Sequence, residues 1–158
     1  MTLKKQLNVG VFGAGHLGKI HLRLLNESKR FNLVGFYDPD VKASQALAKA
    51  SGYVYFDNQD ELIGACEVID IVTPTLYHHA VAKDCITQGK HIFIEKPITR
   101  TVEEAEELVQ LADEKGVKGQ VGHVERFNPA FKAVKQSLGQ PMFVESHRLA
   151  EFNPRGTD

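Results

Sequence analysis

The sequence predicts an α/β fold, a doubly wound parallel sheet with helices on both of its faces. Strand-like and helix-like segments alternate along most of the chain, which is the order of repeated βα units. The strand-like segments are apolar nearly throughout, as expected for strands that helices cover on both sides. The chain has 158 residues, of which 42% are hydrophobic and 25% are charged. This length and composition are typical of one globular domain.

The expected strands are short runs rich in apolar and β-branched residues. They cover residues 8–13, 32–38, 53–56, 67–73, 91–95 and 118–122. Apolar residues at helical spacing, or an Ala-rich composition, predict helices between them. These helices cover residues 16–28, 41–50, 76–88 and 101–115. Thr101 and Glu104 fit a capping box at the start of the last helix, and Gly116 is placed to end it.

Residues 123–158 follow a different pattern. A helix is predicted from Asn128-Pro129 to Leu138, and a strand is predicted over residues 142–149. One helix and one strand cannot form a core alone. We therefore expect a complete domain at residues 1–122, followed at 123–158 by a junction and the beginning of an incomplete C-terminal α/β domain.

The edges of the predicted strand at 142–149 need hydrogen-bond partners, and neither of its faces is cleanly apolar. We expect it to pair with a second copy of the chain through residues 141–150, which makes the protein a homo-oligomer. Folding back on the first domain and a frayed tail are the alternatives, because a two-stranded ribbon is only marginally stable.

Charge, hydropathy and cysteine content exclude several classes of protein. Lys plus Arg is 19 and Asp plus Glu is 20, so the basic excess of a nucleic-acid binder is missing. No apolar run reaches the roughly 18 residues that a membrane span needs, and we expect no signal peptide. Cys66 and Cys85 form no CxxC motif, and together with His78 and His79 they lack the spacing of metal ligands. A reduced, cytoplasmic protein without a metal site is expected.

The stretch Gly13-Ala14-Gly15-His16-Leu17-Gly18 has the pattern G-x-G-x-x-G between a predicted strand and a predicted helix. In this context the pattern indicates a Rossmann-type dinucleotide site. Gly13 allows the tight turn, Gly15 lets the backbone approach a pyrophosphate, and Gly18 lets helix and strand pack closely. The helix N-terminus offers unpaired N–H groups to the anion. The alternative is an ordinary glycine-rich turn.

Asp38 ends the second predicted strand, 20 residues after Gly18. A carboxylate at this place can accept hydrogen bonds from the ribose hydroxyls of the cofactor. Asp40 adds a second negative charge and no Arg follows directly, which favours NAD over NADP, although Lys42 is a nearby cation. The alternative role for either aspartate is a helix N-cap. Both roles are compatible, with Asp40 as the cap and Asp38 on the ribose.

Two further segments follow predicted strands and should lie at the ligand edge of the sheet. Glu95-Lys96-Pro97 delivers an ammonium group that can hydrogen-bond a substrate hydroxyl and shuttle its proton; the alternative is a surface lysine. Thr73-Pro74-Thr75-Leu76-Tyr77-His78 could form the floor of the cofactor cleft. After the sixth strand, Arg126 could contact an anionic or carboxamide group, unless its segment is only a domain junction whose polar groups pair locally.

Taken together, these motifs resemble the Gfo/Idh/MocA oxidoreductases, the family of glucose–fructose oxidoreductase and inositol dehydrogenase. The matching segments are G-A-G-H-L-G at 13–18, Y-D-P-D at 37–40, T-P-T-x-x-H at 73–78, E-K-P at 95–97 and R-F-N-P at 126–129. The stretch at 122–130 looks especially like the sugar-nucleotide branch, which includes UDP-N-acetylglucosamine 3-dehydrogenases.

The resemblance implies roles for individual residues. Lys96 would be the catalytic lysine and Glu95 its cofactor-contacting neighbour. Residues on the nicotinamide side would be Thr73, Pro74, His78 and Arg126. The family also carries a catalytic Asp and His on a C-terminal substrate domain, and neither can be placed in this sequence.

Two functions follow as hypotheses. The first is an NAD-dependent oxidoreductase that transfers a hydride between nicotinamide and a hydroxyl carbon of a sugar or sugar nucleotide, present here as its cofactor-binding portion and inactive alone. The second is a non-catalytic NAD-binding or regulatory module. The E-K-P motif favours the enzyme, and the early end of the sequence favours the module.

Overall fold

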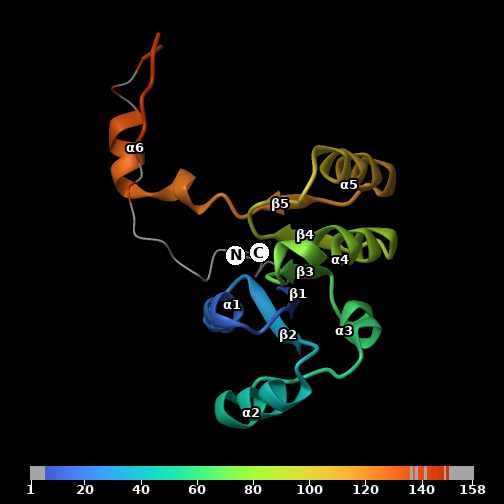
Figure 1. Cartoon of the computed structure of the whole chain (residues 1–158). Helices are drawn as coiled ribbons and strands as arrows, with labels where there is room; N and C mark the ends of the chain where they lie inside the picture. The colour runs from blue at the N-terminus through green and yellow to red at the C-terminus, as the bar shows by residue number, and fades with distance from the viewer. Residues whose placement is uncertain (1–5, 136, 138, 141, 148, 150–158) are drawn as a thin grey trace, which may run out of the picture. The chain divides into compact units, whose positions relative to one another are not determined.

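A five-stranded parallel sheet forms the centre of the first part of the chain (Figure 1). The computed structural model describes residues 6–135, 137, 139–140, 142–147 and 149. The strand order is β2-β1-β3-β4-β5, and every neighbouring pair is parallel. The strands are β1 (Leu7–Phe12), β2 (Phe31–Tyr37), β3 (Val68–Ile71), β4 (His91–Ile94) and β5 (Gly119–Val121). The predicted Rossmann-type α/β fold is confirmed.

Helices cover the two faces of the sheet in separate groups, as expected for a doubly wound fold (Figure 1). The first group consists of α1 (His16–Asn26) and α2 (Val41–Ser51), and the second of α3 (Gln59–Ala65), α4 (Thr75–Thr87) and α5 (Val102–Lys115). Neighbouring strand residues point to opposite faces. Val11 accordingly packs with Leu22 of α1, whereas Phe12 belongs to the core that includes Ile63 of α3 and Leu108 of α5.

The helix ends follow the local sequence. The capping box at Thr101 and Glu104 is present, and Gly116 ends α5 in the left-handed conformation. Asp40 caps α2 by accepting a hydrogen bond from the backbone N–H of Ala43, which confirms the capping role.

Within residues 53–65 one prediction was wrong and one helix was missed. The strand predicted at 53–56 is reduced to one parallel bridge between Phe36 and Tyr55. It ends early because the chain turns into α3, whose N-cap Asn58 accepts a hydrogen bond from the N–H of Asp60. Helix α3 was not predicted, since its seven residues are too few to show a helical period.

The chain divides into two compact units at Gly122 and His123. The second unit contains the 3₁₀ helix η1 (Val124–Phe127) and α6 (Pro129–Lys135). The strand predicted over 142–149 is not formed, because the described residues 142–147 and 149 have no strand structure. Pairing with a second copy through residues 141–150 stays a prediction, and positions 136, 138, 141, 148 and 150 lie outside the described residues.

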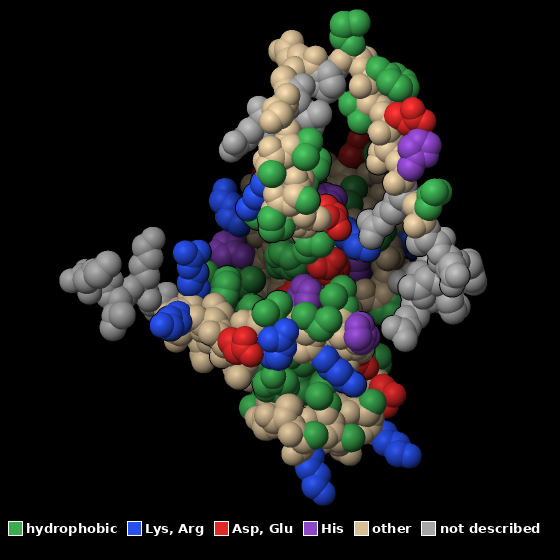
Figure 2. Space-filling model, turned by 90° about the vertical axis from the view of Figure 1, so that its left-hand side faces the viewer, with side chains coloured by type: hydrophobic (Ala, Val, Ile, Leu, Met, Phe, Trp, Pro, Cys, Tyr) green, Lys and Arg blue, Asp and Glu red, His purple; other side chains and the backbone are tan. Residues whose placement is uncertain are grey.

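Charged side chains on the face shown in Figure 2 are mixed in sign. Lys and Arg side chains lie singly among acidic, histidine and apolar ones, and the described residues on this face form no continuous basic patch. None of the described helices is both long and apolar enough to cross a membrane.

Candidate functional site

The glycine loop between β1 and α1 has little room for side chains. Gly13 has a φ of +95°, and a Cβ there would lie 2.7 Å from the carbonyl oxygen of Val72. A Cβ on Gly18 would lie 2.0 Å from the carbonyl oxygen of Gly13, so glycine is required for the helix to pack on the turn. A Cβ on Gly15 would meet nothing within 4 Å, which leaves open space above the loop.

The N-terminus of α1 is available to an anion. Gly15 is the N-cap residue and provides no side-chain cap, and the first turn contains no acidic residue. Unpaired N–H groups and the helix dipole favour a negative group at such an end. An uncapped helix below an open glycine fits the pyrophosphate of a dinucleotide. Ala14, His16 and Leu17 complete the predicted loop around it.

Asp38 connects the end of β2 to the glycine loop. Its Oδ2 accepts a hydrogen bond of 2.7 Å from the Ala14 N–H, and its Oδ1 accepts one of 2.9 Å from the Asp40 N–H. The carboxylate is only partly buried and each oxygen has further lone pairs. It is therefore oriented by the backbone while it still has acceptor capacity for ribose hydroxyls.

The loops after β1, β2, β3 and β4 gather at one edge of the sheet, because the strands are parallel. Backbone hydrogen bonds tie them together: Gly13 N–H donates to Tyr37 at 2.9 Å, Val72 N–H to Phe12 at 2.8 Å, and Glu95 N–H to Ile71 at 3.0 Å. Ligands in open α/β sheets bind at this edge. The segments that the sequence predicted for the cofactor site follow strands at this edge.

Lys96 follows β4 and is exposed, and it precedes a cis peptide bond to Pro97. No hydrogen bond or ion pair of its ammonium group is found in the part of the chain that the structure describes. The ammonium group is therefore free to meet a ligand at the edge of the sheet.

Thr73, in the loop after β3, has a buried Oγ1 without a hydrogen-bond partner among the described residues. A bound ligand could supply that partner.

His78 was predicted to lie on the nicotinamide side, and the structure places its ring inside the protein next to this edge of the sheet. Its side chain on α4 is 1% exposed. One ring nitrogen, Nε2, lies 2.8 Å from the carbonyl oxygen of Thr73, and Nδ1 lies 2.9 Å from that of Pro97. With the ring buried and both nitrogens engaged, His78 links the loop after β3 to the loop after β4.

Glu95 was predicted to contact the cofactor, but its carboxylate points into the protein. The residue is 6% exposed. Its Oε2 accepts a hydrogen bond of 3.1 Å from the Lys96 N–H, and its Oε1 lies 3.5 Å from Nε2 of His21. A Cβ on Gly122 would lie 2.6 Å from the same Oε1, so the carboxylate fills space that a larger residue at 122 would need.

Asp70 completes a buried cluster that sequence reasoning missed. Its Oδ2 lies 2.9 Å from Nδ1 of His21, and its Oδ1 has no hydrogen-bond partner among the described residues. Neither His21 nor Asp70 was assigned to the site from the sequence. A lone acid within the apolar strand Val68–Ile71 was the available signal, because such residues are rarely buried without a partner.

The charges of the cluster influence each other. Burial alone would lower the pKa of His21, but the hydrogen bond and charge of Asp70 and the charge of Glu95 outweigh burial and raise it above its ordinary value. Burial raises the pKa of Asp70, although His21 opposes this shift. Burial disfavours an isolated charge, and only the opposite charge nearby offsets it.

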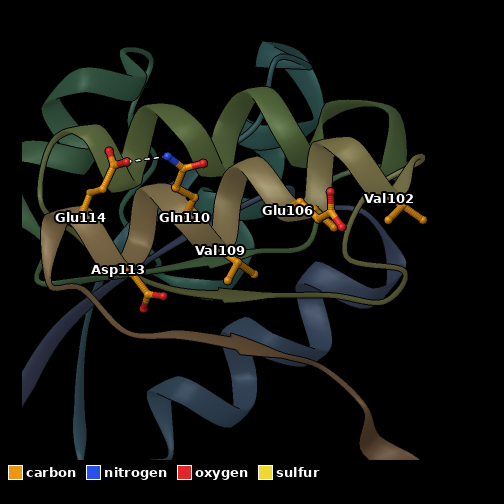
Figure 3. Close-up of a pocket in the computed structure, with 7 residues that line it drawn as sticks. Val102, Glu106, Val109, Gln110, Asp113 and Glu114 are labelled. Carbon is orange, nitrogen blue, oxygen red and sulfur yellow. Dashed lines mark hydrogen bonds between the residues drawn. The ribbon is translucent and has the colours of Figure 1, made fainter.

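A separate groove of about 510 Å³ lies along the outside of α5 (Figure 3). Its lining residues all belong to that helix: Val102, Ala105, Glu106, Val109, Gln110, Asp113 and Glu114. They recur at helical spacing on the exposed side, and none lies in a loop at the carboxyl edge of the sheet. Geometry therefore separates this groove from the candidate cofactor site.

Arg126, the remaining predicted site residue, lies exposed on η1 in the second unit.

Comparison with known proteins identifies the family of the chain. The family model GFO_IDH_MocA, described as "Oxidoreductase family, NAD-binding Rossmann fold", matches residues 7–123. The chain is 35% identical over 153 residues to UDP-N-acetylglucosamine 3-dehydrogenase of Acidithiobacillus ferrooxidans, covering 96% of this chain and 48% of that protein. It is 31% identical over 144 residues to glucose-6-phosphate 3-dehydrogenase of Bacillus subtilis, covering 88% of this chain and 41% of that protein.

Solved structures show the same relationship. The A. ferrooxidans UDP-N-acetylglucosamine 3-dehydrogenase superposes with a TM-score of 0.86 at 35% identity, covering 98% of this chain and 51% of that chain. GenD2 from gentamicin A biosynthesis, solved in complex with NAD, superposes with a TM-score of 0.81 at 25% identity, covering 88% of this chain and 40% of that chain.

The chain spans about half the length of the curated relatives it matches. The family match nevertheless includes the whole parallel sheet, the glycine loop and the Glu95-Lys96-Pro97 loop. The resemblance seen in the motifs is confirmed: the chain belongs to the Gfo/Idh/MocA oxidoreductase family, whose Rossmann domain binds NAD.

Proposed function

We propose that this chain is the cofactor-binding part of an NAD-dependent dehydrogenase that acts on a hydroxyl carbon of a sugar or sugar nucleotide. The observation that carries the proposal is the edge of the sheet, where an open Gly15, the oriented carboxylate of Asp38 and the exposed Lys96 follow β1, β2 and β4. The names of two relatives, which are dehydrogenases acting at C3 of UDP-N-acetylglucosamine and of glucose 6-phosphate, support the substrate class.

Each residue then has a chemical task. The N-terminus of α1 binds the pyrophosphate, and Asp38 accepts hydrogen bonds from the adenosine ribose. NAD, when bound, supplies the hydride acceptor. Lys96 hydrogen-bonds the substrate hydroxyl, and in its neutral amine form it accepts the hydroxyl proton, becoming the ammonium as the hydride leaves the carbon. Thr73 and Pro74 form the wall next to the ring, and His78 and Glu95 hold the loops that carry Thr73 and Lys96.

Residues 123–158 are proposed to be the junction and the beginning of the substrate domain. This is supported by the division of the chain into compact units after Gly122. Arg126 is proposed to contact the nicotinamide side from this segment, on the strength of the R-F-N-P motif.

The test has two parts. NADH should bind this chain and enhance nucleotide fluorescence in a titration. Turnover is measured on the whole protein with sugar nucleotides and sugar phosphates, unmutated and as Lys96→Met. General acid–base assistance is worth about 10²–10⁴-fold, so Lys96→Met should retain NADH binding and lose turnover by that factor. Near-normal turnover would make Lys96 a surface lysine.

A further inference from the structure

Three buried or half-buried ionisable groups lie together beneath the loop that carries Lys96. His21 comes from α1, Asp70 from β3 and Glu95 from the end of β4. Asp70 and Glu95 are 4% and 6% exposed. The ring of Phe93 packs on His21 with 5.9 Å between ring centroids and shields the imidazole. Within the described residues no group of such side chains is placed to hold a metal ion, so the cluster needs another explanation.

The geometry favours a charged imidazole. His21 has one ring nitrogen 2.9 Å from Asp70 and the other 3.5 Å from Glu95. A neutral imidazole has one N–H donor and could serve only one of the two carboxylates, whereas the imidazolium serves both. These two acids are the charged groups that face His21, one from each neighbouring strand, and the free Oδ1 of Asp70 leaves that carboxylate dependent on His21 for compensation.

Glu95 transmits this arrangement to the loop. Its Oε1 faces His21, and its Oε2 accepts the hydrogen bond from the Lys96 N–H at 3.1 Å. Gly122 lies against the same carboxylate, since a Cβ at that position would lie 2.6 Å from Oε1. A carboxylate held on one oxygen therefore fixes the backbone position of Lys96 through the other.

We propose that His21 is a positioning residue which, when protonated, bridges Asp70 and Glu95 and thereby holds the Lys96 loop in its place at the cofactor site. Loss of the His21 proton releases Glu95 and loosens the Lys96 backbone. The consequence for cofactor affinity rests on the proposed function, whereas the coupling between His21 and the Lys96 amide does not.

The coupling is measured by NMR on the isotope-labelled chain as a function of pH. The ring of His21 should titrate with a midpoint above its ordinary value of about 6.5. The amide signal of Lys96 should shift with the same midpoint, and this shift should vanish in His21→Gln. The control is His79→Gln, which removes a surface histidine paired with Glu107 at 2.7 Å and should leave the Lys96 titration intact.

NADH affinity provides the second readout. The dissociation constant of the unmutated chain should rise about fivefold or more from pH 6.5 to 8.5, the lower end of ordinary coupling between sites. In His21→Gln, NADH binding should be weak at both pH values. The proposal is overturned if the Lys96 amide signal does not shift with the His21 titration. It is also overturned if NADH binds but its affinity does not change with pH.

If His21→Gln fails to fold, the pH titrations of the His21 ring and the Lys96 amide in the unmutated chain still test whether the two are coupled. If NADH does not bind at either pH, the proposed function fails, and the amide titration still decides whether His21 positions the loop.

Discussion

Replacing Asp38 by alanine separates two tasks of one carboxylate. In the structure it accepts hydrogen bonds from the N–H groups of Ala14 at 2.7 Å and Asp40 at 2.9 Å. In the proposed complex it also accepts from the ribose. Asp38→Ala should therefore lower both the free energy of unfolding and the preference for NADH over NADPH.

The size of each effect can be worked out. A hydrogen bond to a charged group contributes about 1.5–3 kcal/mol when buried, and less where water competes. The bond from Asp40 is exposed and the bond from Ala14 is partly buried, so we expect Asp38→Ala to lose about 1–2 kcal/mol of stability. Removing the ribose acceptor and the repulsion of a 2′-phosphate should narrow the NADH preference by about 1–3 kcal/mol, or about 5- to 150-fold.

Asp40→Ala is the matched control. It removes the N-cap of α2, where the side chain accepts from Ala43, and should also lose about 1 kcal/mol. It should narrow the cofactor preference less than Asp38→Ala does, because it removes a nearby negative charge but no hydrogen-bond acceptor for the ribose. Urea unfolding measures the stability of both variants, and fluorescence titrations with NADH and NADPH measure preference. If Asp38→Ala keeps the full preference, or the unmutated chain binds both cofactors equally, the assignment of Asp38 to the ribose is refuted.

Three further outcomes are expected. Gly18→Ala should abolish NADH binding and destabilise the domain, because its Cβ would lie 2.0 Å from the Gly13 carbonyl oxygen. The control is Gly64→Ala, whose Cβ meets nothing within 4 Å. In urea unfolding this control should be neutral or stabilising by about 0.5–1 kcal/mol. Burial would lower the pKa of His21, but its acidic neighbours raise it above the ordinary value. The contribution of His21 to stability is therefore fully present below about pH 6.5 and is lost as the pH rises through the higher pKa of the folded state. Urea midpoints between pH 6 and 8.5 that are the same with and without His21 would contradict this. Thr101→Ala should lose about 0.5–2 kcal/mol with the capping box of α5, and a thermal melt unchanged from the parent would show that the cap is not stabilising.

Local patterns were sufficient for much of the fold and part of the site. The alternation of apolar strands with helices predicted the parallel sheet, and the glycine spacing placed Gly13, Gly15 and Gly18 where the structure has its open turn. Asp38 and Lys96 could be assigned to the ligand edge because each directly follows a strand. Such features depend on residues close together in sequence, so the sequence contains their full cause.

Two strand predictions that were based on local composition failed. Residues 53–56 have strand-like composition but form only one bridge, because α3 begins immediately after them. Residues 142–149 alternate like a strand, yet no described residue there is in one, since a strand is stable only when another strand pairs with it.

Sequence by itself determined the βα order, the glycine loop and which polar segments follow the strands. Only the tertiary structure decided that His78 joins two loops and that His21 meets Asp70, 49 positions away, and Glu95 beyond it. The physical reason is that these contacts depend on which strands are neighbours and on which face α1 packs. That arrangement is set by burial of the whole core rather than by any local run of residues.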